Sequence, residues 1–183
     1  YYVARTQQSM GQLFASSETY ERLAKLGDGH FRKDDMLAAG MANRAIIQAY
    51  LTQPGAIASA KQALAYSTDV WEANLLCAYV LKEHHEYIVA EDAILRNLDV
   101  DLEKSQSQQA LVGLYLASGD QTKLAIRLSD PAMVRELSAA QLLMCATKLG
   151  DLRTPPAVVQ ALQRTLQVAP RFNLGRDDLD PIV

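Results

Sequence analysis

Two short helical segments follow one another in residues 56–83, which read AIASAKQALAYSTDVWEANLLCAYVLKE. In Ala56–Tyr66 the apolar residues recur every three or four positions, the spacing of one face of an α-helix. Residues 67–69 are Ser, Thr and Asp, the types that end one helix and cap the next. We therefore expect one helix up to Tyr66, a tight turn, and a second helix from about Val70.

The same alternation of helical segment and turn extends in both directions along the chain. The expected helices span residues 3–15, 18–26, 34–51, 56–66, 70–83, 87–98, 105–118, 121–128, 137–149 and 157–168. Gly119-Asp120 and Gly150-Asp151 form turns, because Gly ends a helix and Asp caps the next one. Asp130-Pro131 closes a helix, since Pro cannot continue one. No segment shows the two-residue alternation of a strand, so an all-α fold is predicted.

The helical pairs recur at a nearly constant interval. Trp71 opens one pair and Ser105, 34 residues later, opens the next. The turn at His85 is likewise followed 34 residues later by the turn at Gly119, and Gly150 comes after a further 31. A helix–turn–helix unit of about 34 residues is the period of tetratricopeptide repeats.

Residues 36–170 resemble the tetratricopeptide-repeat (TPR) family. The segment ALQRTLQVAP (161–170) is similar to a second helix of that family. Other positions that match the family pattern are Cys77, Ala78, Ala90, Ile94, Tyr115, Leu142 and Ala146. Positions that depart from it are Asn74, Leu102, Gln108, Val112, Leu124, Ala139 and Leu143, which leaves other helical-pair arrays open. The resemblance implies a right-handed α-solenoid of about four to five antiparallel helix pairs.

Three regions are predicted along the chain. Residues 1–35 form an N-terminal helical pair, either a degenerate repeat or a cap. Residues 36–170 carry the TPR-like repeats. Residues 171–183 (RFNLGRDDLDPIV) show no helical period and are expected to form an extended tail.

Composition and charge narrow the classes of function. The chain has 183 residues, 21% charged and 49% hydrophobic, as in an ordinary globular domain. Its net charge of -3 and scattered basic residues argue against nucleic-acid binding. No apolar run approaches the roughly 20 residues of a membrane span, and no signal peptide is visible.

The compartment is only weakly indicated. Cys77 and Cys145 lack CxxC spacing and are expected to be small buried hydrophobes, which fits a reducing environment. The prediction leans to the cytoplasm. Because the chain begins at Tyr1 and not at Met, a periplasmic or membrane-anchored fragment stays open.

No catalytic residue, cofactor site or metal site is predicted. Three groups have the composition of a site without its spacing: His84-His85-Glu86, His30, and the acids Asp177, Asp178 and Asp180. Adjacent residues do not share a helix face, and zinc needs three or four convergent ligands. The first group is therefore expected to be an inter-helix turn.

The resemblance instead implies a partner-binding groove lined by the first helix of each pair. Its predicted residues are Arg44, Gln48, Glu72, Leu75, Tyr79, Lys82, Gln106, Gln109, Gly113, Leu116, Met144 and Lys148. A mixed apolar and polar groove suits a helix or an extended segment of another protein. Leu75 and Leu116 have an equally strong alternative as ordinary packing between helices.

The predicted function is therefore a protein–protein interaction module, such as a scaffold, adaptor or assembly factor, and not an enzyme. One alternative is a helical regulatory or structural domain of a larger enzyme or membrane-anchored protein. Another is a self-associating piece, with residues 1–3 and Leu13-Phe14 as cap or dimer contact.

Overall fold

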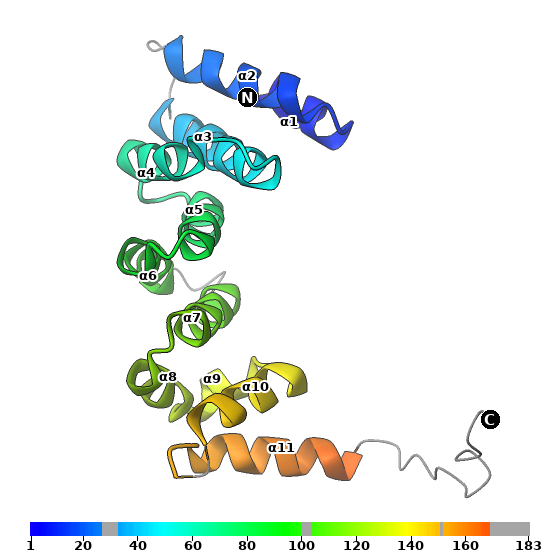
Figure 1. The fold of residues 1–183 in the computed structure, drawn as a ribbon, viewed down its shortest axis with the longest axis vertical. Coiled ribbons are helices and arrows are strands. Elements are labelled where there is room, and N and C mark those ends of the chain that lie inside the picture. Colours follow the sequence, from blue (N-terminus) through cyan, green and yellow to red (C-terminus); the bar gives the residue numbers. More distant parts are fainter. Residues whose placement is uncertain (27–32, 100–103, 151, 169–183) are drawn as a thin grey trace, which may run out of the picture. The chain divides into compact units, whose positions relative to one another are not determined.

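A computed structural model describes residues 1–26, 33–99, 104–150 and 152–168 (Figure 1). Within these ranges the regular structure is helical and no strand occurs, so the all-α prediction is confirmed. The α-helices are α1 Tyr2–Ser9, α2 Leu13–Lys25, α3 Lys33–Tyr50, α4 Ala56–Tyr66, α5 Trp71–Glu83, α6 Tyr87–Arg96, α7 Lys104–Ser118, α8 Gln121–Leu128, α9 Pro131–Arg135, α10 Ala139–Leu149 and α11 Pro156–Val168. A short 3-10 helix, η1 (Asn97–Asp99), follows α6.

The chain forms two compact units, Tyr1–Leu124 and Ala125–Val183. In the first unit each helix from α1 to α7 packs against the next one, except that α7 follows α6 through η1. In addition, α3 packs against α5, and α5 packs against α7. The alternate helices α3, α5 and α7 are therefore neighbours in space as well as members of successive pairs.

The turns within the helix pairs share one backbone feature. Gly11, His85, Gly119 and Gly150 all have positive φ angles, between 63° and 75°. A left-handed residue at this point ends a helix and reverses the chain, which is why Gly is favoured there. The predicted turns at His85, Gly119 and Gly150 are confirmed by this geometry.

The core of the first unit contains many small side chains. Its fully buried large residues include Met41, Ile47, Leu81, Ile94 and Leu114. Buried alanines are frequent in α3 and α4: Ala38, Ala42, Ala45, Ala56, Ala60 and Ala63. Small residues let helix backbones approach closely. A Cβ atom on Gly40 of α3 would stand 3.2 Å from the side chains of both Tyr20 and Leu23 on α2.

The break in the N-terminal pair was predicted wrongly. The chain turns at Gly11, and α2 already begins at Leu13, so Ser16 and Ser17 lie inside a helix. The Ser16 hydroxyl donates a hydrogen bond of 2.7 Å to the Ala4 carbonyl of α1. These serines are buried in the contact between the two helices, although the same residue types are common in turns. Further along, α3 begins at Lys33, ahead of the predicted repeat boundary at Met36.

The second unit contains an element that the sequence reading missed. Asp130-Pro131 was expected only to close α8, but it also opens α9: the Asp130 carboxylate accepts a hydrogen bond from the Ala132 amide, and Pro131 is the first helical residue. The following helix, α10, begins at Ala139 instead of Leu137, because Ser138 forms a capping box with Gln141. Both α9 and α10 pack against α11. The predicted tail, residues 171–183, lies outside the described residues.

Candidate partner-binding surface

Four predicted groove residues lie on α5, and their exposure rises toward its outer side. Leu75 and Lys82 are half-buried, and Glu72 is exposed. Tyr79 is 55% exposed, a high value for an aromatic side chain. The Lys82 ammonium lies 5.0 Å from the centre of the Tyr79 ring and 3.0 Å from the Glu83 carboxylate. This face of α5 thus presents an aromatic ring flanked by charges of both signs.

The neighbouring helix α7 supplies four more predicted residues. Gln106 is exposed, and Gln109, Gly113 and Leu116 are half-buried. Gly113 stands 34 positions after Tyr79, so the two occupy equivalent places in the repeat. A Cβ atom on Gly113 would meet no atom within 4 Å. Unlike Gly40, this glycine is therefore not required by the packing of the helices.

The two predicted residues on α3 are engaged within the fold. Arg44 forms an ion pair of 2.8 Å with Glu21 of α2. Gln48 is 6% exposed, and its carboxamide oxygen accepts a hydrogen bond of 2.7 Å from the Ser59 hydroxyl of α4. Both side chains join α3 to a neighbouring helix. We therefore restrict the candidate surface of the first unit to α5 and α7.

Met144 and Lys148, the last two predicted residues, lie on α10 in the second unit. Met144 is 59% exposed and Lys148 is also exposed. Adjacent to Met144, Leu143 is 60% exposed. The helical spacing of α10 had placed Leu143 only as a departure from the repeat pattern, so its exposure was not foreseen. These residues are considered separately below.

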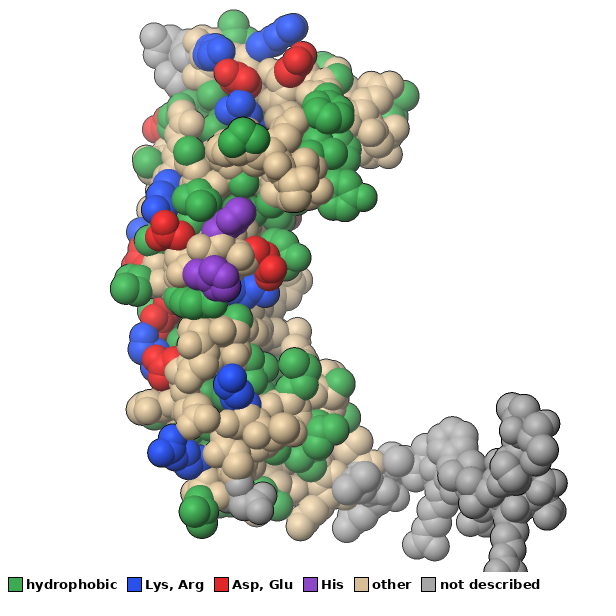
Figure 2. Space-filling model, viewed as in Figure 1, with side chains coloured by type: hydrophobic (Ala, Val, Ile, Leu, Met, Phe, Trp, Pro, Cys, Tyr) green, Lys and Arg blue, Asp and Glu red, His purple; other side chains and the backbone are tan. Residues whose placement is uncertain are grey.

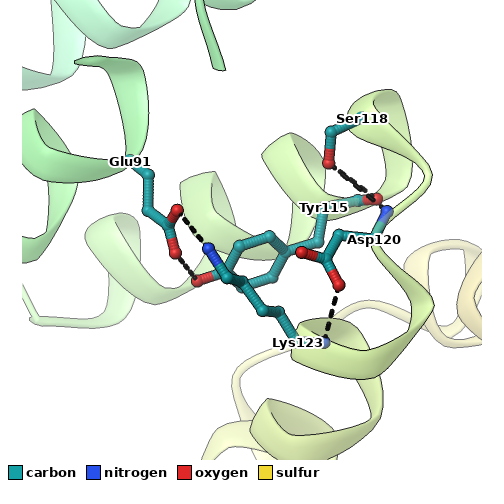
Figure 3. A network of polar contacts seen from close by, with 5 residues as sticks. All are labelled: Glu91, Tyr115, Ser118, Asp120 and Lys123. Carbon is teal, nitrogen blue, oxygen red and sulfur yellow. Dashed lines mark hydrogen bonds and ion pairs between the residues drawn. The ribbon is translucent and has the colours of Figure 1, made fainter. Parts of the chain in front are cut away.

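A polar network holds α6, α7 and α8 together beside this surface (Figure 3). The Glu91 carboxylate of α6 accepts hydrogen bonds from the Tyr115 hydroxyl of α7, at 2.8 Å, and the Lys123 ammonium of α8, at 2.6 Å. The Lys123 backbone amide donates to the Asp120 carboxylate, which confirms Asp120 as a cap of α8. The network therefore fixes the helix that follows the candidate surface.

The charges of this network shift one another's protonation. Desolvation raises the pKa of the Glu91 carboxyl, but the hydrogen bonds from Lys123 and Tyr115 and the charge of Lys123 lower it more, so the net direction is downward. The hydrogen bond to Glu91 raises the pKa of the Lys123 ammonium. Both shifts favour the ion pair at neutral pH.

We expect Glu91→Gln to lower the free energy of unfolding at pH 7 by about 0.5–1 kcal/mol, because the ion pair is partly exposed. A carboxyl with a lowered folded-state pKa stabilises the fold above its unfolded-state pKa. The difference between wild type and variant should therefore shrink as the pH falls from about 5 to about 3. Urea titrations of both proteins across this range measure it, and a difference independent of pH would contradict the assignment.

The other reactive residue types occupy structural positions. The thiols of Cys77 and Cys145 are free and buried, and burial raises their pKa values to about 12 and about 11. They therefore stay protonated at neutral pH, as expected of buried hydrophobes. His85 lies in the α5–α6 turn, where its Nδ1 contacts the Tyr87 hydroxyl at 2.7 Å.

Metal and membrane features were also searched for in the described residues. No group of three or more His, Cys, Asp or Glu in these ranges is arranged to hold a metal ion. In the same ranges, no helix is both long and apolar enough to cross a membrane. The predicted positions of His30 and of Asp177, Asp178 and Asp180 lie outside the described residues.

Comparison with protein-family models, curated proteins and solved structures finds no match to this chain.

Proposed function

We propose that this chain is a protein-binding module of TPR-like repeats, and that the surface of α5 and α7 binds a segment of another protein. The periodicity of the helices supports the repeat. The second helices of successive pairs begin at Tyr87, at Gln121 34 residues later, and at Pro156 after a further 35. In the first unit α5 packs against both α3 and α7, as the first helices of adjacent repeats do in such arrays.

The pairing of Tyr79 with Gly113 carries the proposal. An aromatic side chain that is 55% exposed stands on one helix, and the equivalent position of the next helix has no side chain at all. Exposed aromatic residues often anchor a partner. Glycine within a helix costs stability, and a close approach of another chain is one reason to keep it. A partner segment that packs on the Tyr79 ring and against the α7 backbone accounts for both features.

The surrounding side chains indicate the character of that segment. Glu72, Lys82 and Glu83 on α5 carry charges of both signs, and Gln106 on α7 is neutral and polar. On the face drawn in Figure 2, positive and negative side chains are likewise interspersed. The surface thus lacks the single-sign field that attracts nucleic acid. An extended or helical peptide with mixed apolar and polar side chains is the partner that we propose.

Substitution of Gly113 by Ala separates binding from stability. We expect Gly113→Ala to raise the free energy of unfolding by about 0.5–1 kcal/mol, because alanine is the better helix former and the added methyl group has room. The same methyl group should weaken capture of the partner. Chemical denaturation measures the first effect, and affinity capture with the full chain as bait measures the second.

The capture experiment uses native cell extract and four baits: the wild type, Tyr79→Ala, Gly113→Ala and the control Ile88→Ala. Ile88 is 85% exposed but lies on α6, outside the proposed surface. Support requires a protein that the wild type and Ile88→Ala both capture and that Tyr79→Ala and Gly113→Ala lose. If all four baits capture the same proteins, the surface of α5 and α7 is not the binding site.

A further inference from the structure

Helix α10 is apolar on two opposite sides. Leu142, Cys145 and Leu149 point inward and are buried in the second unit. On the opposite side Leu143 is 60% and Met144 is 59% exposed. A helix that is hydrophobic all round is normally covered all round. The second unit covers only one side of α10, so the other side has the composition of an interface.

The outer face of α10 consists of six exposed residues at helical spacing: Ala139, Ala140, Leu143, Met144, Thr147 and Lys148. Hydrophobic side chains gather over this helix in the space-filling view of Figure 2. The Thr147 hydroxyl donates to the Leu143 carbonyl of its own helix, at 2.8 Å, and is thereby satisfied without an outside partner. Lys148, at the C-terminal end, carries the only charge of this face.

We propose that the outer face of α10 binds the same face of a second copy of this chain, with the two helices antiparallel. A two-fold interface requires a surface that complements itself: if one residue contacts another, the converse contact also forms. The outer face meets this condition in size. Its first half carries the small residues Ala139 and Ala140, and its second half carries the large residues Leu143 and Met144. Antiparallel pairing places small residues opposite large ones.

The charges around the helix require the same arrangement. Glu136 is exposed just before the N-terminal end of α10, and Lys148 is exposed at the C-terminal end. Residue 142 is the midpoint between Glu136 and Lys148, and also between Ala140 and Met144. One two-fold axis near this residue therefore places Ala140 opposite Met144 and Glu136 opposite Lys148 of the second copy. Opposite charges across an interface fix its register.

The first experiment measures the mass of the full chain by sedimentation over a concentration range. We expect a reversible dimer, and we expect Leu143→Asp to raise its dissociation constant at least about 30-fold, since a buried anchor is replaced by a charge. Ala140→Arg, which fills the small half of the face, should act in the same direction. Leu152→Asp is the matched control, because Leu152 is fully exposed in the same unit but outside α10.

A charge reversal tests the antiparallel register. Glu136→Lys and Lys148→Glu should each weaken the dimer, and the double variant should restore it. A chain that is monomeric at every concentration overturns the proposal, as does a dimer that Leu143→Asp and Ala140→Arg leave intact. Failure of the double variant to restore association overturns the antiparallel pairing. The inference is independent of the partner-binding surface, because Tyr79→Ala on α5 is expected to leave the dimer unchanged.

Discussion

The Tyr20→Ala variant should lose about 3–5 kcal/mol of its free energy of unfolding, the range for removing a large buried aromatic side chain. Tyr20 of α2 is fully buried and clusters with Ala4 of α1 and Ile47 of α3. Three helices thus meet on one ring, and the half-buried Leu13 packs against the same cluster. Loss of the ring leaves a cavity that these helices cannot close without moving.

The control variant is Tyr20→Phe, which keeps the ring and removes only the hydroxyl. That hydroxyl donates to the Gln8 side chain at 3.2 Å, so we expect a loss of about 1 kcal/mol. Burial also raises the pKa of the Tyr20 phenol, so the wild type should lose stability as the pH rises above about 10, and Tyr20→Phe should lose less. Urea denaturation measures both. Equal losses in Tyr20→Ala and Tyr20→Phe would show that the ring does not hold the three helices together.

The helix boundaries in the middle of the chain were predictable because their signals are local. α4 spans Ala56–Tyr66, as the apolar spacing predicted, and α5 begins at Trp71 directly after the predicted turn. The turn at Gly119 needs a positive φ, and glycine supplies it without strain. Where residue type and backbone geometry correspond in this way, no knowledge of the tertiary structure is needed.

Boundaries were missed where one residue type serves two purposes. Serine favours turns, but Ser16 uses its hydroxyl to bond the backbone of α1 from inside α2. Asp-Pro ends a helix, but the same pair caps and begins the next one at Pro131. Which role applies depends on the neighbouring helix, and that information is not local.

The candidate surface was predictable in outline but not residue by residue. Repeat register identified α5 and α7 and the facing positions Tyr79 and Gly113. It did not show that Gln48 bonds Ser59 on α4, because the two residues come from different helices. Register likewise marked Asn74 only as a departure from the repeat pattern. Its reason is a buried partner, Asn97, which comes 23 residues later in the chain.

The pairing of Asn74 with Asn97 leads to the second prediction of a large effect. Both side chains are 1% exposed, and the Asn74 amide donates to the Asn97 side-chain oxygen at 2.8 Å. Asn97 in turn donates to the Trp71 carbonyl at 3.0 Å, at the start of α5. We expect Asn97→Ala to lower the free energy of unfolding by about 2–4 kcal/mol, because it removes partners from two buried polar groups at once.

Two further variants distinguish this pair from a simple loss of packing. If the two amides stabilise the fold as a pair, the double variant Asn74→Ala, Asn97→Ala should lose less than the sum of the single losses, and additive losses would contradict the pairing. Asn97→Asp should be strongly destabilised at pH 7, since its carboxylate is buried and cannot donate to Trp71. Protonation restores a donor, and burial raises the pKa of such a carboxyl, so the stability of this variant should approach that of wild type as the pH falls. Urea titrations between about pH 7 and pH 4 measure this recovery, and a constant difference would show that the Asn97 amide does not donate to Trp71.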